Sequence, residues 1–415
     1  MKIFKFGGAS VKDAESVKNV ATILNHEGYK DTMVVLSAMG KMTNAFEEVI
    51  HSYISKNENL PGKIDFIRGY HYHIISHLFE NNTSEILFEA EQLFGQLSGF
   101  LLQNKNKDYN FIYDQIIGFG ELLSTKIVSS YLNLVGIKNT WIDVRNYIET
   151  DATYRDAYVN WEKSKQQIEA LNTETLLISQ GFLGRSANGN TTSLGREGSD
   201  FTAAIFAHCL NAESVTIWKD VDGVLNADPR YFETTQLLQQ IPYDEAIEMA
   251  FYGASVIHPK TLKPLENKDI PLYVRSFFNL NSKGTVVGKG QLLLPEVPCF
   301  ILKTNQILVS ISAIDFSFMV EFNLSDIFKT LHENKLKVSL IQNSALSFSV
   351  CIEDKFNTFK HFLNEIENKY KVSYIEGVSL YTIRHATEDS IGLIENKGVV
   401  LLKQATKGTV QMVMQ

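Results

Sequence analysis

Short apolar segments alternate with helix-like stretches from the start of the chain to about residue 290. Each apolar segment is followed by a turn or loop rich in glycine, serine, aspartate or asparagine. This alternation predicts a three-layer α/β sandwich with a largely parallel sheet, whose ligands collect beyond the carboxyl ends of the strands. The segments predicted as strands are Lys2–Phe6, Met33–Ser37, Thr175–Gln180, Ser214–Trp218 and Leu272–Val274.

Two stretches depart from this alternation. Residues from about 50 to 113 form a mostly helical, polar and aromatic pattern without glycine loops suited to phosphate, which predicts a helical insert within a domain of residues 1–285. Residues 286–304 contain Gly288, Gly290, Pro295 and Pro298, which interrupt every periodicity and predict a linker.

Residues 305–415 predict two small units of mixed strands and helices. The first has the order βαββαβ of a ferredoxin-like fold. Its elements are Gln306–Ser312, Leu324–Asn334, Lys337–Gln342, Ser347–Ile352, Lys355–Tyr370 and Val372–Ile375. The second stops before its last helix and strand, so we expect it to be incomplete. Its elements are Val378–Ile383, Ser390–Asn396, Val399–Lys403 and Thr409–Met414.

Composition limits the class of protein. The chain has 415 residues, 44% hydrophobic and 21% charged, which favours two or three folded domains over a disordered chain. The net charge of −8 argues against nucleic acid or an anionic membrane as the main partner. Three widely spaced cysteines and the lack of a secretory or membrane-spanning apolar run predict a reduced, cytoplasmic protein.

The segment Thr191–Asp200 carries small hydroxyls, two glycines, an arginine and a carboxylate directly before a helix expected from Phe201. Glycines let backbone amides approach an anion, and a helix N-terminus favours negative charge at the same spot. Arg196 between two glycines matches a carboxylate or phosphate better than an ordinary capped loop does. Ser199 and Asp200 are suitable N-caps.

Other candidate residues follow the predicted strands. Lys5 precedes Gly7 and Gly8 after the first strand, where a phosphate contact and a solvated lysine are about equally good interpretations. Ser37 and Thr43 offer hydroxyls after the second strand, although ordinary turn chemistry explains them too.

Two further segments carry charge at a helix or strand end. Glu121 begins a helix, where either the helix dipole or a ligand ammonium accounts for it. The loop Trp218–Arg230 has two aspartates at a turn, suited to a nucleotide and its Mg²⁺ or to a plain Asp-Gly turn.

Taken in order, these segments resemble the aspartate kinases of the amino acid kinase superfamily over nearly the whole chain. The two C-terminal units resemble the tandem ACT regulatory domains of that family. The segments that carry the resemblance are Lys5–Gly8, Ser37–Asn44, Gly120–Glu121, Gln180–Phe182, Thr191–Asp200, Trp218–Arg230 and His258–Pro259.

The resemblance implies ATP-dependent phosphorylation of the β-carboxylate of L-aspartate, the first step towards lysine, threonine and methionine. It implies Mg²⁺ with the ATP, an amino-acid effector such as lysine or threonine, and a homodimer formed through the ACT-like region. A carboxylate nucleophile is ionised at neutral pH and needs no catalytic base. Catalysis then depends on positioning the reactants and on stabilising the charge of the transferred phosphoryl group.

The resemblance also implies roles for individual residues. Lys5 and Asp200 are expected to be catalytic, with Lys5 on the transferred phosphoryl group and Asp200 orienting Lys5. Arg196 would hold the α-carboxylate of the substrate and Glu121 its ammonium group. The substrate-binding set is Ser37, Thr43, Glu121, Phe182, Arg196 and Ser199. The nucleotide-binding set is Lys5, Gly7, Gly8, Lys219, Asp220, Leu225, Arg230, Ser255 and Val256. No residue is expected to be a dedicated metal ligand.

Some positions depart from the family pattern. Ser255 stands where many members carry a lysine that contacts ATP, and Lys219 stands where threonine is usual. We hypothesise that Lys219 supplies the missing cation. Ser339 occupies a position where an effector-binding aspartate is common.

Two alternatives stay open at this stage. One is a glutamate-directed kinase of the same superfamily, although an acetylated substrate would not need Glu121. The other is a non-catalytic amino-acid sensor, which the combination of Lys5, Arg196 and Asp200 argues against.

Overall fold

The computed structural model describes residues 1–80, 82–254, 257–315 and 317–415. They form two compact units, and each is described by itself. The first unit comprises Met1–Val224, Leu237–Ile247 and Val256–Leu294. The second comprises Leu225–Gln236, Glu248–Ser255 and Pro295–Gln415.

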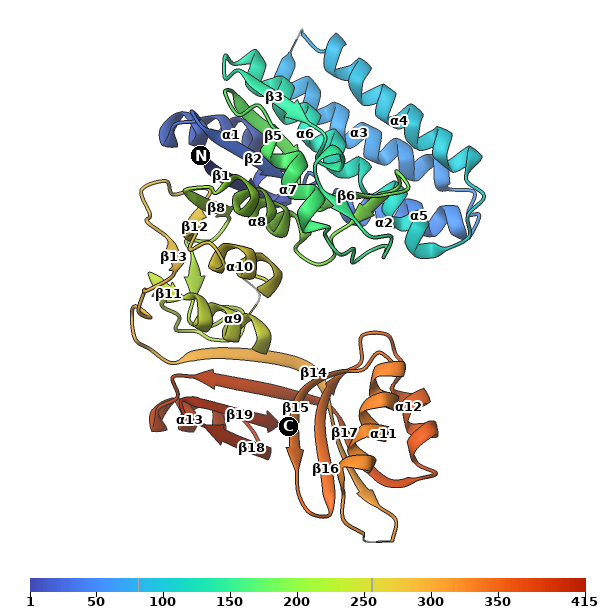
Figure 1. Ribbon diagram of the computed structural model, residues 1–415, viewed down its shortest axis with the longest axis vertical. Coiled ribbons are helices and arrows are strands. Elements are labelled where there is room, and N and C mark those ends of the chain that lie inside the picture. The colour runs from blue at the N-terminus through green and yellow to red at the C-terminus, as the bar shows by residue number, and fades with distance from the viewer. Residues whose placement is uncertain (81, 255–256, 316) are drawn as a thin grey trace. The chain divides into compact units, whose positions relative to one another are not determined.

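The first unit is built on a mostly parallel sheet with the order β11-β13-β12-β8-β1-β2-β5-β3 in the described part of the chain (Figure 1). Its β12–β13 pair is antiparallel. The strands are β1 Lys2–Phe6, β2 Thr32–Leu36, β3 Asn139–Ile142, β5 Leu176–Gln180, β8 Ser214–Lys219, β11 Gln240–Pro242, β12 Leu272–Ser276 and β13 Thr285–Gly288. The five strands predicted from the sequence are confirmed to within two residues, and the predicted α/β class is confirmed with them.

Helices cover this sheet because its central strands are apolar on both faces. All five residues of β2 and of β5 are buried. Helix α8 lies against β1, β2 and β8, and in turn contacts α7 and α10. The helices are α1 Ala14–Glu27, α2 Met42–Ile54, α3 Leu60–Phe79, α4 Ser84–Gln103, α5 Tyr109–Ile117, α6 Phe119–Leu134, α7 Trp161–Glu169, α8 Gly198–Leu210, α9 Tyr243–Tyr252 and α10 Pro259–Glu266, with short 3₁₀ turns η1 Gly8–Val11 and η2 Val144–Asn146.

The predicted helical insert corresponds to α3, α4 and α5. Its apolar side chains, such as Ile74 of α3 and Phe94 of α4, belong to the same core cluster as Val34 and Leu36 of β2. The insert therefore shares the core of the sheet. None of the helices in the described ranges is long and apolar enough to cross a membrane.

Short strands complete the first part of the chain. A small sheet has the order β4-β6-β7. Its last strand, β7, leads into the loop before α8. The remaining bounds are β4 Glu149–Thr150, β6 Leu183–Ser186, β7 Thr191–Ser193, β9 Val224–Leu225 and β10 Leu237–Leu238.

The second unit contains an antiparallel sheet of order β15-β16-β14-β17-β19-β18. Its elements are β14 Cys299–Ala313, α11 Glu321–Glu333, β15 Lys337–Asn343, β16 Ser347–Glu353, α12 Phe359–Ile366, β17 Tyr370–Arg384, α13 Glu388–Glu395, β18 Val400–Thr406 and β19 Thr409–Met414. The predicted βαββαβ order of the first C-terminal unit is confirmed, although the second helix is shorter than expected. Asp354 accepts hydrogen bonds from the backbone N–H groups of Thr358 and Phe359, so the segment before Phe359 forms a turn.

The strands β14 and β17 are each long enough to serve two ferredoxin-like modules. In the inner module, residues 306–376, the second half of β14 pairs with the first half of β17. In the outer module, residues 378–414 join the first half of β14, because Cys299–Lys303 pairs with Leu380–Arg384. The segment Cys299–Lys303 was expected in the linker, yet it supplies a fourth strand to the sheet of the outer module.

Candidate active site

The ends of four neighbouring strands lie together at one edge of the sheet. In the parallel register, Phe6 at the end of β1 lies opposite Leu36 of β2 and Trp218 of β8, and Leu36 lies opposite Gln180 of β5. The residues that follow these positions are Gly7, Ser37, Gly181 and Lys219. Most of the candidate residues therefore gather at this edge, as expected for a parallel α/β sheet.

Backbone loops approach each other closely at this edge. The N–H of Gly40 donates to the carbonyl of Gly8 at 3.0 Å. A Cβ atom on Gly8 would lie 2.8 Å from the carbonyl oxygens of Ala38 and Gly40. Glycine at position 8 is required because the loops after β1 and β2 leave no room for a side chain.

Lys5 and Asp200 form a buried ion pair. The Lys5 Nζ lies 2.6 Å from the Oδ1 of Asp200, and the two side chains are 10% and 3% exposed. Lys5 comes from the end of β1, and Asp200 from the first turn of α8. The position of a Cβ on Gly7 is 3.5 Å from the same Nζ, so the glycine turn borders the ammonium group.

The start of α8 differs from the start predicted from the sequence. The helix begins at Gly198, three residues earlier than expected, and Ser199 and Asp200 lie in its first turn instead of capping it. The N-cap is Glu197, which takes the left-handed conformation with φ 53°. Gly198 permits the first turn to pack closely on Phe182, since a Cβ there would lie 2.7 Å from the ring of Phe182.

Phe182 is fixed by its backbone. Its φ of 70° is in the left-handed region, which is uncommon for an aromatic residue. Its N–H donates to Thr202 Oγ1 and its carbonyl accepts from the N–H of Leu194, both at 2.9 Å. These two bonds hold the end of β5 between α8 and the loop that follows β7.

Glu121 is a buried carboxyl group in the first turn of α6. It is 3% exposed, and its Oε2 has no hydrogen-bond partner among the residues that the structure describes. Burial raises the pKa of Glu121 to about 8, and the backbone amides of Glu121 and Ala38 only partly oppose this rise. A buried carboxyl group with an unmatched oxygen is suited to a cation brought by a ligand.

One cavity of about 270 Å³ brings most of these groups together. We call it the Lys5 cavity. Its lining residues are Lys5, Ser37, Thr43, Glu121, Phe182, Gly195, Glu197, Gly198, Ser199, Asp200 and Lys219. Eight predicted site residues are among them, contributed by strands and helices spread over more than 200 positions of the chain.

Other predicted residues lie elsewhere. Arg196 is exposed and does not line the Lys5 cavity. Asp220 directly follows Lys219 and is exposed. Leu225 and Arg230 belong to the second unit, where the Arg230 guanidinium donates three hydrogen bonds to the Asp228 carboxylate. Ser255 and Val256 lie outside the described residues.

Two acidic residues in or next to the glycine-rich segment were not predicted as functional from the sequence. Glu197 lines the Lys5 cavity, and its Oε2 has no hydrogen-bond partner in the described part of the chain. Burial raises the pKa of Glu197, although Lys219 opposes this. The sequence signal for Glu197 was its position beside Arg196, in the pair of residues between two glycines.

The second overlooked residue is Asp114 of α5, which is fully buried and accepts hydrogen bonds from the N–H and Oγ of Ser193 at 2.9 and 2.6 Å. Burial raises the pKa of Asp114 to about 6. Asp114 ties β7, at the start of the glycine-rich segment, to the helical insert.

Comparison with known proteins identifies relatives of this chain. Residues 1–276 match the sequence profile described as the Amino acid kinase family. The chain is 30% identical to Lysine-sensitive aspartokinase 3 of Escherichia coli strain K12, over 92% of this chain and 86% of that protein. It is 29% identical to Aspartokinase 1, chloroplastic, of Arabidopsis thaliana, over 100% of this chain and 75% of that protein.

A solved structure shows the same similarity in three dimensions. The crystal structure of E. coli aspartokinase III in complex with aspartate and ADP in the R-state matches with a TM-score of 0.85. The match has 26% sequence identity and covers 100% of this chain and 96% of that chain. The chain belongs to the amino acid kinase family, and within it to the aspartokinases.

Proposed function

We propose that this chain transfers the γ-phosphoryl group of ATP to the β-carboxylate of L-aspartate, giving 4-phospho-L-aspartate for the synthesis of lysine, threonine and methionine. The observation that carries the proposal is the Lys5 cavity, which combines the Lys5–Asp200 ion pair with the buried carboxyl group of Glu121. The relative crystallised with aspartate and ADP supports both substrates.

The reaction needs charge stabilisation and little acid–base chemistry. The attacking carboxylate of aspartate is ionised at neutral pH. Lys5 stabilises the charge on the transferred phosphoryl group, and Asp200 fixes the position of the ammonium group. The first turn of α8 adds its positive end to the same region. These groups act on charge that develops in the transition state, so they lower its free energy more than that of the bound substrates.

Each charge of the amino acid has a proposed partner. Glu121 accepts the ammonium group of aspartate after losing its own proton, and Arg196 holds the α-carboxylate. Because Arg196 is exposed in the ligand-free chain, this role requires its side chain to turn towards the Lys5 cavity when aspartate binds. Ser37, Thr43, Phe182 and Ser199 complete the proposed aspartate pocket.

The nucleotide is proposed to approach from the end of β8. Lys219 lines the Lys5 cavity together with Lys5, which supports our hypothesis that it contacts the ATP phosphates in place of the lysine missing at Ser255. Gly7 borders the Lys5 ammonium group. Gly8, Asp220, Leu225, Arg230, Ser255 and Val256 remain proposed nucleotide contacts. Replacing Lys219 with alanine should raise the KM for ATP, and an unchanged KM would refute this role.

Mg²⁺ is proposed to arrive with ATP. This ion prefers oxygen ligands and takes one or two carboxylates beside phosphates and water. Glu197 and Asp200 fit this chemistry, since both carboxylates line the Lys5 cavity and no described residue forms a hydrogen bond with the Oε2 of Glu197. The ion would neutralise negative charge on the phosphates.

Location and assembly are also proposals. Cys209, Cys299 and Cys351 are buried thiols, which fits a cytoplasmic, reducing environment. We propose a homodimer through the second unit. Apolar side chains around the start of α11 are exposed there, among them Phe318 at 68% and Phe322 at 80%. A monomeric mass in light scattering would contradict the dimer. The same unit is proposed to bind an amino-acid effector.

The activity is tested by measuring ADP release with aspartate, glutamate and N-acetylglutamate as acceptors. We expect turnover with aspartate, and none with N-acetylglutamate, since Glu121 requires a free ammonium group. Turnover with glutamate or N-acetylglutamate instead would assign a different kinase of the family, and turnover with none would favour a non-catalytic sensor.

A further inference from the structure

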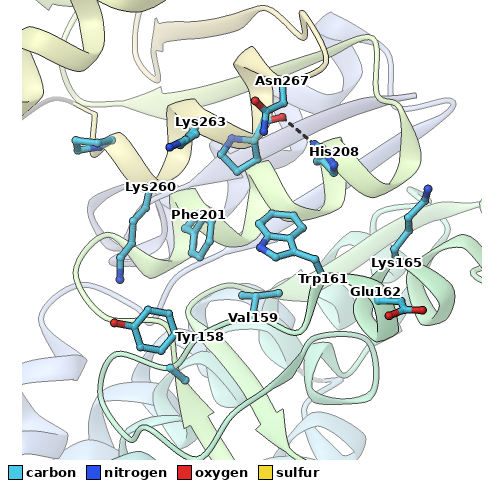
Figure 2. A pocket seen from close by; sticks show the side chains of 13 residues that line it. Tyr158, Val159, Trp161, Glu162, Lys165, Phe201, His208, Lys260, Lys263 and Asn267 are labelled. Atoms are coloured by element: carbon cyan, nitrogen blue, oxygen red, sulfur yellow. Dashed lines mark hydrogen bonds between the residues drawn. The ribbon is translucent and has the colours of Figure 1, made fainter.

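The first unit contains a second cavity, of about 900 Å³, which shares no lining residue with the Lys5 cavity (Figure 2). We call it the Trp161 cavity. Its walls come from α7, α8, α10 and the segment before α7. Nothing in the proposed reaction uses these residues.

The floor of the Trp161 cavity is aromatic. The ring of Trp161 lies edge-on to Phe201 and to His208 of α8, with centroids 6.3 and 5.3 Å apart. Trp161 is nevertheless 38% exposed, and Tyr158 is 70% exposed. Figure 2 shows both side chains in the lining of the cavity. Exposed aromatic faces around a cavity favour a flat, aromatic ligand that stacks on them or meets them edge-on.

The rim of the Trp161 cavity is positively charged. Its lining residues include three lysines, Lys165, Lys260 and Lys263, and one carboxylate, Glu162, while Lys260 is also ion-paired with Asp156. The ion pair of Lys165 with Glu169 is exposed and 3.7 Å long, so little of its charge is neutralised. Because the chain as a whole is negatively charged, this local excess of cations favours an anionic group on the ligand.

Two structural links connect the two cavities. Phe201, in the floor of the Trp161 cavity, directly follows Asp200 on α8. Lys260 is ion-paired with Asp156, and Asp156 packs against Gly195, which lines the Lys5 cavity. An anion that attracts Lys260 therefore competes with Asp156 for the lysine. Loss of this ion pair changes how Asp156 packs against the loop around Gly195.

We propose that the Trp161 cavity is a regulatory site for a small planar aromatic anion, an aromatic ring system that bears a carboxylate, sulfonate or phosphate group. Its occupation weakens the binding of aspartate through Lys260, Asp156 and Gly195. The binding site stands on the cavity alone, whereas the effect on aspartate rests on the proposed function.

Binding is tested on the full chain with two probes that differ only in charge. One is 8-anilinonaphthalene-1-sulfonate, and the other is N-phenyl-1-naphthylamine, which has the same rings without the sulfonate. We expect the anionic probe to bind more tightly. The double variant Lys165→Glu/Lys263→Glu should raise its Kd by about tenfold, because the rim becomes negative.

Two controls accompany this comparison. The double variant Lys18→Glu/Lys289→Glu makes the same change in net charge at exposed lysines of the first unit that do not line the cavity, and it should leave the Kd unchanged. The neutral probe should bind every variant equally, which also verifies folding. Equal affinity for both probes, or equal effects of the two double variants, would overturn the site.

The regulatory effect is tested by the KM for aspartate at saturating anionic probe. We expect the KM to rise at least twofold in the unmodified chain and not in Lys165→Glu/Lys263→Glu. An unchanged KM would overturn the coupling. The comparison of the two probes decides the binding site even if the chain phosphorylates a different amino acid.

Discussion

The ammonium group of Lys5 lies 2.6 Å from a carboxylate oxygen of Asp200, and both side chains are nearly buried in the wall of the Lys5 cavity. A buried pair of this kind is costly to break but contributes little net stability, because both charges leave water when it forms. Its position beside the N-terminus of α8 fits the proposed catalytic role better than a role in stability.

The ion pair predicts that a single substitution lowers both activity and stability, whereas a double substitution restores stability alone. Replacing Asp200 with asparagine should lower kcat by about 100- to 1000-fold and the free energy of unfolding by about 3–5 kcal/mol, since Lys5 stays buried and unpaired. The double variant Lys5→Met/Asp200→Leu should recover most of the stability in urea unfolding but none of the activity. Recovered activity in the double variant would exclude a role for Lys5 on the phosphoryl group.

Glu121 predicts a pH dependence of aspartate binding. Its pKa of about 8 means that the free protein holds a proton there at neutral pH. Binding the substrate ammonium requires the carboxylate, so the KM for aspartate should fall as pH rises from 6 to 8, by up to about tenfold per pH unit. Glu121→Gln should raise the KM and remove its pH dependence. The dependence can be measured by ADP release at fixed, saturating ATP.

The same group predicts a pH dependence of stability. The folded pKa of Glu121 lies above its ordinary value of 4.5, so the unfolded chain loses this proton first as pH rises. The contribution of Glu121 to stability is fully present below pH 4.5 and is lost as pH rises to about 8, at up to about 1.4 kcal/mol per pH unit. Urea unfolding of the ligand-free chain at pH 5.5, 6.5 and 7.5 should show this loss, and Glu121→Gln should show less of it.

A pair of glycine substitutions separates close packing from helix propensity. Gly8→Ala should destabilise the chain by about 1–3 kcal/mol and reduce turnover, because its Cβ would meet two carbonyl oxygens at 2.8 Å. Gly99→Ala in α4 is the matched control, since a Cβ there meets nothing within 4 Å. It should stabilise the chain by about 0.5–1 kcal/mol and leave turnover unchanged. Thermal unfolding of the two variants gives the comparison.

The second unit predicts weak feedback inhibition by lysine. The Nζ of Lys303 lies 3.2 Å from the Oγ of Ser339, at a position where the resemblance to aspartate kinases implies an effector-binding aspartate. Burial lowers the pKa of Lys303, but a neighbouring cation in place of an acid still disfavours a cationic effector. We expect millimolar L-lysine to leave the activity nearly unchanged. Strong inhibition by lysine would contradict this assignment.

The strands and glycine loops could be predicted from the sequence because their signals are local. Lys2–Phe6 is apolar, and it is followed at once by glycines that mark the turn. The gathering of Lys5, Glu121 and Asp200 could be inferred only through the resemblance, since periodicity does not show which strand ends become neighbours. Glu197 was overlooked because its burial depends on the left-handed turn that begins α8, and single-sequence patterns do not reveal such a turn.

The segment Cys299–Lys303 shows a second limit. Its neighbours Pro295 and Pro298 indicate a linker, and its pairing partner lies about 80 positions further along the chain. A short strand is recognisable when its partner is close in sequence, whereas a distant partner leaves no local trace.

The division of β14 between two modules has a consequence for the order in which the chain folds during synthesis. The inner module can pair all of its strands once Val378 has left the ribosome. Cys299–Lys303 must wait until Arg384 is available, and β19 closes the outer module only at Met414. A nascent or C-terminally truncated chain therefore carries a folded inner module on an unpaired five-residue segment, which is open to proteases and to pairing with other chains.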